Sequence, residues 1–166
     1  MDCLFCKIVK KEIPARVVYN DSDTIAFLDI NPANPGHVLV VPKKHHEMIM
    51  DADDDMLKKS VLVVRELSKK IMEEMKADGI NVVQNNGKHA GQLVPHVHFH
   101  IIPRFPEDMV VISYKRSQIE DKKMDEIRKK LETKPLHFEE VHHKKHDEEE
   151  NKPKKEAVPA DKWVDL

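Results

Sequence analysis

HVHFHIIP, residues 96–103, is the stretch of this chain that decides the fold. Its β-branched and aromatic residues, closed by a proline, are typical of a β-strand. Side chains alternate across a strand, so we expect the three imidazoles on one face, about 6.6 Å apart, with Val97, Phe99 and Ile101 on the other face. Three histidines at that spacing can act on one ligand, which favours a functional site over an accidental run on an exposed strand.

The composition limits the class of protein. A chain of 166 residues is long enough for one domain with a core of its own. The formal net charge of −2 shows no basic bias, so nucleic acid is not an expected partner. An apolar run of about 18 residues and a signal-peptide pattern are both missing, so we expect no membrane partner and a cytoplasmic location.

The rest of the sequence predicts an α+β fold with an antiparallel sheet, because runs of strands are separated by single helices. Strands are expected at 16–20, 24–29, 37–42, 80–84 and 96–102, and helices at 53–76 and 117–133. The nearly continuous apolar run at 37–42 predicts a central strand that is covered on both faces. Gly79 is expected to end the long helix.

The N-terminus carries a C-x-x-C motif, Cys3 and Cys6. A thioredoxin-like motif would sit between a strand and a helix, whereas this pair lies at the start of the chain. Half of a zinc site is therefore the better interpretation, with two further ligands supplied from elsewhere in the chain.

The tail has a different character from the preceding domain, which we place at 1–133. Residues 134–166 combine dense charge with His142, His143 and His146, a group that suits either a metal site or a solvated segment. The single tryptophan, Trp163, predicts an apolar anchor that docks on a folded surface.

The motifs together resemble the histidine triad (HIT) superfamily. The resemblance rests on the triad at 96–102 and on matching segments before and after it, at 5–15, 26–30, 36–45, 85–92 and 102–104. It implies a HIT-like fold with one long and one C-terminal helix, a two-fold homodimer, and the zinc-containing microbial branch of nucleotide-binding hydrolases. The uridylyltransferase branch carries Gln at the third triad position, where this chain has His100.

The resemblance also implies the catalytic residues. His98 matches the nucleophile that attacks an α-phosphorus and forms a covalent nucleotidyl-histidine, and neutral imidazole is a competent nucleophile near pH 7. His37 and His100 match the histidines beside the phosphate. For His37 the alternative is a satisfied core histidine at the start of a buried strand.

The residues that match the family's nucleotide pocket come from three segments. Asp29 corresponds to the carboxylate that binds the ribose hydroxyls. The clamp on the base and the loop beside the phosphate correspond to Leu4, Phe5, Phe27, Ile30, Asn85, Gly91 and Gln92. One position departs from the family, because many members have Ser or Thr where this chain has Leu93. We therefore expect slower turnover or a shifted preference for the leaving group.

In the zinc-containing members the metal ligands match Cys3, Cys6, His45 and His96, with His46 as the adjacent alternative to His45. Two sulfurs and two nitrogens form a closed tetrahedral set, which suits a structural zinc ion.

Two classes of function follow from the resemblance. The first is an enzyme that hydrolyses adenosine phosphoramidates or dinucleoside polyphosphates at the α-phosphate. The second is a nucleotide-binding regulatory module with little turnover. A metallohydrolase is a distant third, because the chain has no histidine-rich motif with an aspartate ligand.

Overall fold

The computed structural model describes residues 3–112 and 116–136. The chain divides into two compact units, Met1–Tyr114 and Lys115–Leu166. The histidine group at 142–146 and Trp163 lie outside the described residues.

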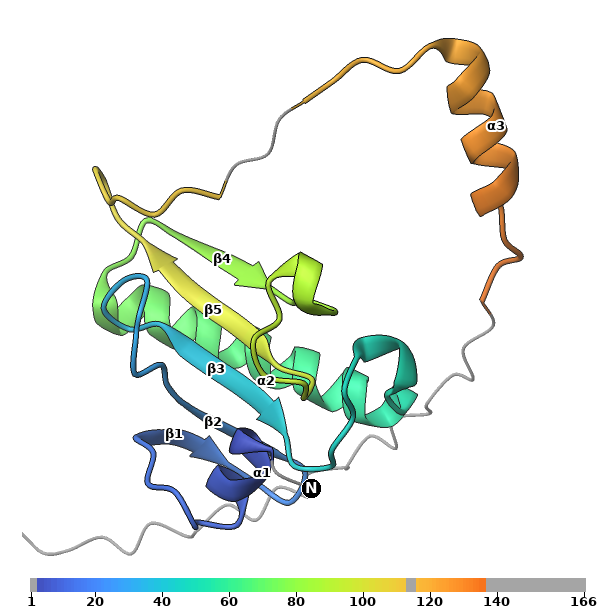
Figure 1. The fold of residues 1–166 in the computed structure, drawn as a ribbon. Coiled ribbons are helices and arrows are strands. Elements are labelled where there is room, and N and C mark those ends of the chain that lie inside the picture. The colour runs from blue at the N-terminus through green and yellow to red at the C-terminus, as the bar shows by residue number, and fades with distance from the viewer. Residues whose placement is uncertain (1–2, 113–115, 137–166) are drawn as a thin grey trace, which may run out of the picture. The chain divides into compact units, whose positions relative to one another are not determined.

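An antiparallel five-stranded sheet forms the first unit, as the sequence predicts (Figure 1). Its spatial order is β1-β2-β3-β5-β4. The strands are β1 (Val17–Asn20), β2 (Thr24–Leu28), β3 (Val38–Pro42), β4 (Gly79–Val83) and β5 (Phe99–Arg104). Strand β3 lies between two neighbours and is buried along its whole length, so the central covered strand is confirmed.

The long helix α2 (Asp54–Met75) runs across one face of this sheet (Figure 1). It begins with Asp54 and Asp55, whose negative charges favour a helix N-terminus. The prediction that Gly79 ends the helix is wrong. Lys76 ends it by adopting a left-handed conformation with φ of 53°, and Gly79 is the first residue of β4.

The other helices are short. Helix α1 (Leu4–Val9) is not predicted by the sequence pattern, because six residues give too few turns for a helical period to stand out. Two 3₁₀ turns cover Ile49–Asp51 and Lys88–Ala90. In the second unit, α3 (Asp121–Leu131) is shorter than the predicted helix at 117–133, and it buries none of its side chains.

Two apolar clusters hold the first unit together, one on each face of the sheet. The cluster under α2 contains Val97, Phe99 and Ile101 from the histidine-rich stretch. The cluster under α1 contains Phe5, Ile8, Phe27 and other residues of β2 and β3. The predicted alternation is therefore confirmed for the apolar side chains of residues 96–102.

The predicted start of this strand is wrong, because β5 begins at Phe99 and His96 lies before it. The register pairs Phe99 with Val40, so the next pair two residues further along would place Val97 opposite Pro42. A proline has no N–H to donate to a ladder. The N–H of Val97 instead donates to the carbonyl of His46 at 2.8 Å.

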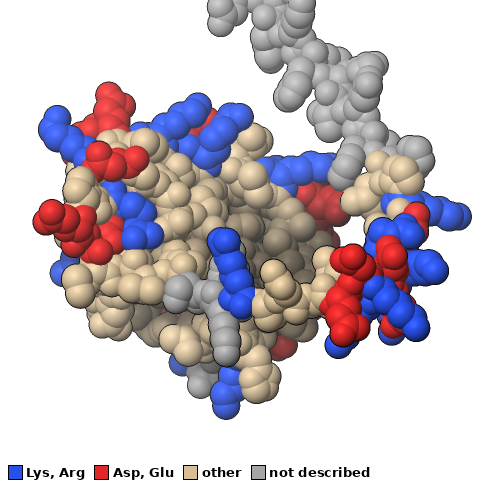
Figure 2. All heavy atoms as spheres, turned by 90° about the horizontal axis from the view of Figure 1, so that it is seen from above, with Lys and Arg blue, Asp and Glu red and all other residues tan. Residues whose placement is uncertain are grey.

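Lys and Arg side chains intermingle with Asp and Glu on the face shown in Figure 2. The surface of the described residues in this view has no large area of one charge. None of the helices in the described part of the chain has the length and apolar character to cross a membrane.

Replacing Ile71 by Ala should lower the free energy of unfolding by about 2–5 kcal/mol, because the side chain is 8% exposed and packs between α2 and the sheet. Val61 on the same helix is 53% exposed, so Val61→Ala should change it by less than about 0.5 kcal/mol. Urea denaturation of both variants measures the difference. Equal effects of the two substitutions would contradict this packing.

Candidate functional site

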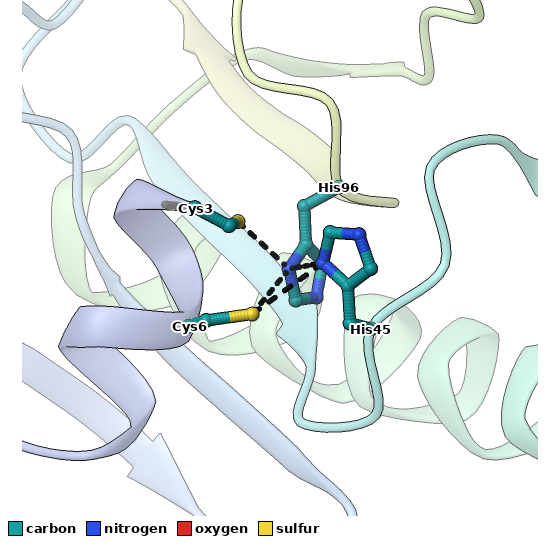
Figure 3. Close-up of side chains that lie close together, drawn as sticks. All are labelled: Cys3, Cys6, His45 and His96. Atoms are coloured by element: carbon teal, nitrogen blue, oxygen red, sulfur yellow. Dashed lines mark hydrogen bonds between the residues drawn. The ribbon is translucent and has the colours of Figure 1, made fainter. Parts of the chain in front are cut away.

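Four side chains from three distant segments converge beside α1 (Figure 3). The Sγ of Cys3 lies 3.4 Å from Nδ1 of His96, and the Sγ of Cys6 lies 3.6 Å from the same atom. The Sγ of Cys6 is also 3.4 Å from Nδ1 of His45, and the two Nδ1 atoms are 3.2 Å apart. The structure thus brings all four predicted metal ligands together.

These distances fit a tetrahedral metal ion. Ordinary zinc–sulfur and zinc–nitrogen bonds place the ligand atoms of one tetrahedron about 3.5 Å apart for sulfur and nitrogen and about 3.3 Å apart for two nitrogens. The Nε2–H of His96 donates to the carbonyl of Pro42 at 2.8 Å, which leaves the Nδ1 lone pair free for a metal. Burial lowers the pKa of His96 to about 4, so the ring is neutral, as a metal ligand must be.

His46 lies outside this cluster. Its Nε2 is 3.4 Å from a carboxylate oxygen of Asp53, next to the start of α2. Of the two adjacent histidines, the structure therefore places His45 with the cysteines.

A cavity of about 440 Å³ lies next to the cluster, on the α1 side of the sheet. Its lining includes residues from α1, from the end of β2 and from the segment that leads into β5. The predicted site residues among them are Leu4, Phe5, Phe27, Asp29, Ile30, Gly91, His98 and His100. Phe5 packs edge-on against the ring of Phe27 at 5.8 Å and against that of His98 at 5.1 Å.

His98 is held in one tautomer. Its Nδ1 lies 2.7 Å from the carbonyl oxygen of His96, and a carbonyl only accepts, so Nδ1 carries the proton. The Nε2 atom therefore holds a lone pair. Burial lowers the pKa of His98 below its ordinary value, which keeps that lone pair available at neutral pH.

His37 and His100 form a directional pair. The N–H of Ala33 donates to Nδ1 of His37 at 3.1 Å, so the proton of this ring is on Nε2. That Nε2–H donates to Nδ1 of His100 at 3.0 Å, which leaves the remaining N–H of His100 on its Nε2. The rings of His100 and His98 are 4.9 Å apart. His37 is thus hydrogen-bonded to a cavity residue without lining the cavity itself.

The rings of this pair are neutral. Burial lowers the pKa of His100 to about 4, with a further contribution from the rings of His98 and His37. Burial also lowers the pKa of His37, and the carboxylate of Asp29, 3.7 Å from its Nδ1, acts in the opposite direction. A cavity lined by neutral imidazoles offers both lone pairs and N–H donors.

Comparison with known proteins identifies the architecture. The family model described as "HIT domain" matches residues 10–107, more than half of the chain. The chain belongs to the HIT domain family. An uncharacterised HIT-like protein of Methanocaldococcus jannaschii is 46% identical over 78% of this chain and 98% of that protein.

Two further HIT proteins are informative. The adenosine 5′-monophosphoramidase of Saccharomyces cerevisiae is 38% identical over 78% of this chain and 80% of the enzyme. The crystal structure of a zinc-bound histidine triad family protein from Mycobacterium smegmatis has a TM-score of 0.64 and 34% identity, covering 70% of this chain and 85% of that one. The family therefore includes an adenosine 5′-monophosphoramidase and a zinc-bound member.

Two residues expected beside the phosphate of a HIT ligand, Asn85 and Gln92, are not in the cavity lining. Gln92 is buried, its Oε1 accepts the N–H of Gly87 at 2.6 Å and its Nε2 donates to the carbonyl of Glu47 at 2.7 Å. Gly91 does line the cavity and has φ of +85°, a conformation that glycine adopts without strain.

Several further residues line the cavity that no sequence motif predicts: Ile8, Ile13, Arg16, Leu39 and Val94. The apolar residues among them are of the types that also form the core. Their hydrophobicity therefore does not distinguish cavity residues from core residues. Arg16 precedes an edge strand and gives no signal of its own.

The ring of His100 should titrate near pH 4, and that of His37 below pH 6.5, in NMR spectra of the folded chain. An unfolded histidine titrates at about 6.5, so the unfolded chain binds more protons between those values. The free energy of unfolding should then fall as the pH is lowered from 6.5 to about 4.

The same rings in a urea-unfolded sample serve as the control, and His100→Asn identifies the signal. A midpoint at or above 6.5 for His100 in the folded chain would contradict the buried neutral pair.

Proposed function

We propose that the chain hydrolyses adenosine phosphoramidates or dinucleoside polyphosphates at the α-phosphate, through a covalent intermediate on Nε2 of His98. The observation that carries the proposal is the hydrogen bond from Nδ1 of His98 to the carbonyl of His96, which directs the lone pair to Nε2 in a cavity lined by His100 and Asp29. The similarity to the yeast monophosphoramidase supports the substrate class.

The nucleoside has matching surroundings in this cavity. Phe5 and Phe27 are apolar surfaces for the base, flanked by Leu4 and Ile30. The carboxylate of Asp29 accepts hydrogen bonds and suits the two ribose hydroxyls. The backbone at Gly91 can approach the phosphate closely because glycine has no Cβ. Gln92 would hold that loop in place through its hydrogen bond with the N–H of Gly87, and the side-chain amide of Asn85 lies beside Gly91.

In the first step, the lone pair on Nε2 of His98 forms a bond to the α-phosphorus, and the bond from phosphorus to the leaving group breaks. A bound phosphate anion favours a charged ring nearby, so the His37–His100 pair takes up one proton from solvent on binding. The proton goes to Nδ1 of His37, which gives up its hydrogen bond with the N–H of Ala33 and faces the carboxylate of Asp29, and the Nε2 proton of His37 passes to Nδ1 of His100 as His100 donates its own. The Nε2–H of His100 then protonates the leaving atom, and the pair returns to its neutral form.

In the second step, water attacks the phosphorus and gives one proton to the His37–His100 pair. The phosphorus–nitrogen bond breaks, its electron pair returns to Nε2 of His98, and the nucleoside monophosphate leaves. The pair then releases the proton to solvent, so atoms and charge balance over the cycle.

Replacing His98 by Ala should lower kcat/KM for adenosine 5′-phosphoramidate by on the order of 10⁴-fold or more, because no other group can form the covalent intermediate. Diadenosine tetraphosphate is assayed in parallel, and the nucleotide products are separated. The substrate that is hydrolysed faster shows whether the chain is a phosphoramidase or a dinucleoside polyphosphate hydrolase. His89→Ala is the matched control, since His89 is exposed and outside the cavity lining, and it should leave the rates unchanged.

Acid-labile adenylyl-protein detected by mass spectrometry after rapid quenching would support the covalent step. Tight binding of AMP by the wild type, with no turnover above that of His98→Ala, would overturn the proposed hydrolase activity. It would favour a nucleotide-binding regulatory module.

We further propose that zinc binds to Cys3, Cys6, His45 and His96 as a structural ion. All four positions of the tetrahedron are occupied by protein atoms, so no position is left for a water molecule. The ion would tie α1 to the segment before β5, and it would stay outside the chemistry.

The purified chain should contain about one zinc ion, and Cys3→Ala/Cys6→Ala should lose it and lower the melting temperature by on the order of 10 °C, since an ion that binds only the folded chain stabilises it. His46→Ala is the matched control and should retain the metal. Zinc retained by the double cysteine variant, or well under one ion in the unmodified chain, would contradict the site.

The preference for adenine and the homodimer stay predictions that follow from the family resemblance. The cytoplasmic location stays a prediction from the sequence pattern.

A further inference from the structure

Exposed apolar side chains border the cavity that contains His98 and His100. Leu28 is 38% exposed, and three other leucine and isoleucine side chains of the lining are more exposed. Leu4 is 45% exposed, Ile30 84% and Leu93 93%, and all three belong to its lining. A single exposed leucine on a protein surface is ordinary, but three around one cavity form an apolar surface that a ligand can cover. These three residues are called the apolar rim.

Leu93 is held outward by its neighbours in the chain. Gln92 is fixed inside by its two hydrogen bonds, to Gly87 and to Glu47. On the other side, Val94 packs against the apolar cluster under α1, and its carbonyl accepts the N–H of His96 at 2.8 Å. With both flanking residues anchored, Leu93 stays on the cavity surface and cannot turn into the core.

Leu93 and His98 are five residues apart in the chain, and both line the cavity. Leu4 and Ile30 instead adjoin Phe5 and Asp29, where the proposed nucleoside lies. With the phosphate at His98, whatever is attached to it extends beyond the nucleoside. Leu93 is the exposed side chain that this part of the substrate would meet.

The cavity has little positive charge for a polyphosphate leaving group. Among the described residues of the lining, Arg16 and Asp29 are the only side chains charged at neutral pH, and their charges oppose each other. A chain of phosphates requires several Arg or Lys side chains, or N–H groups, to bind it.

We propose that Leu93 determines specificity, by selecting substrates in which an uncharged apolar group is attached to the α-phosphate through nitrogen. This inference rests on the proposed function and narrows its substrate class to phosphoramidates of apolar amines, in preference to dinucleoside polyphosphates.

The test compares two substrates, the N-methyl and N-hexyl phosphoramidates of adenosine. Their amines differ in length and hardly in basicity, so the ratio of their kcat/KM values isolates contact with the rim. We expect the N-hexyl compound to be favoured by about tenfold in the wild type, and this ratio to fall toward one in Leu93→Ser. Leu93→Met keeps the apolar volume and should keep the ratio.

Binding of both compounds to His98→Ala, measured by calorimetry, tests the same contact without chemistry. We expect the N-hexyl compound to bind about tenfold more tightly, and this advantage to disappear when Leu93→Ser is added. Absence of turnover in the wild type would overturn the proposed function. The ratio of the dissociation constants of the two compounds would still test the contact with Leu93.

Equal kcat/KM values for the N-methyl and N-hexyl compounds would overturn the role of Leu93, and so would a ratio of these values that Leu93→Ser leaves unchanged. Neither result would contradict the proposed hydrolase activity. Size-exclusion chromatography of the same variant completes the test. A changed oligomeric state with an unchanged ratio would assign Leu93 to a contact between two copies of the chain and overturn the proposal.

Discussion

The arrangement of the site depends on His96, which joins the cysteine cluster to the cavity through one residue. Its ring lies between the sulfur atoms and the carbonyl of Pro42, while its own carbonyl accepts the Nδ1–H of His98 at 2.7 Å. A displacement of the His96 backbone would release the hydrogen bond that determines the tautomer of His98. The proposed structural metal and the proposed nucleophile would therefore be mechanically coupled, with the metal itself outside the proposed chemistry.

A second connection runs through α1. The helix carries Cys6 into the cluster and Phe5 toward the cavity, where the Phe5 ring contacts His96 and His98 at 6.0 and 5.1 Å. Six residues are too few for a stable isolated helix, so α1 requires contacts with the rest of the chain to form. Binding of a metal by Cys3 and Cys6 would supply part of that stabilisation, and it would position one wall of the cavity that contains His98 and His100 as well.

The sequence predicts the fold class, because alternation is a local feature. The convergence of the four cysteine and histidine side chains follows from the resemblance to the HIT superfamily, since spacing alone leaves the partners of the cysteines open. The start of β5 was not predictable from local features, since it depends on which residue of β3 lies opposite Val97, and that residue is Pro42. The tautomer of His37 could not be predicted from the sequence either. It follows from a hydrogen bond with the N–H of Ala33, and only the folded loop brings that donor to Nδ1.

The three neutral imidazoles explain how one cavity can supply both a nucleophile and an acid. Buried rings close to one another disfavour positive charge, so His98 keeps its lone pair and the His37–His100 pair stays unprotonated in the absence of ligand. A phosphate anion at His98 would favour the protonated form of the His37–His100 pair. The carboxylate of Asp29 acts in the same direction, because its negative charge raises the pKa of His37. Substrate binding would then create the acid at the moment when the leaving group requires a proton. The proposed nucleophile, His98, is held by the His96 carbonyl and would need no change of tautomer.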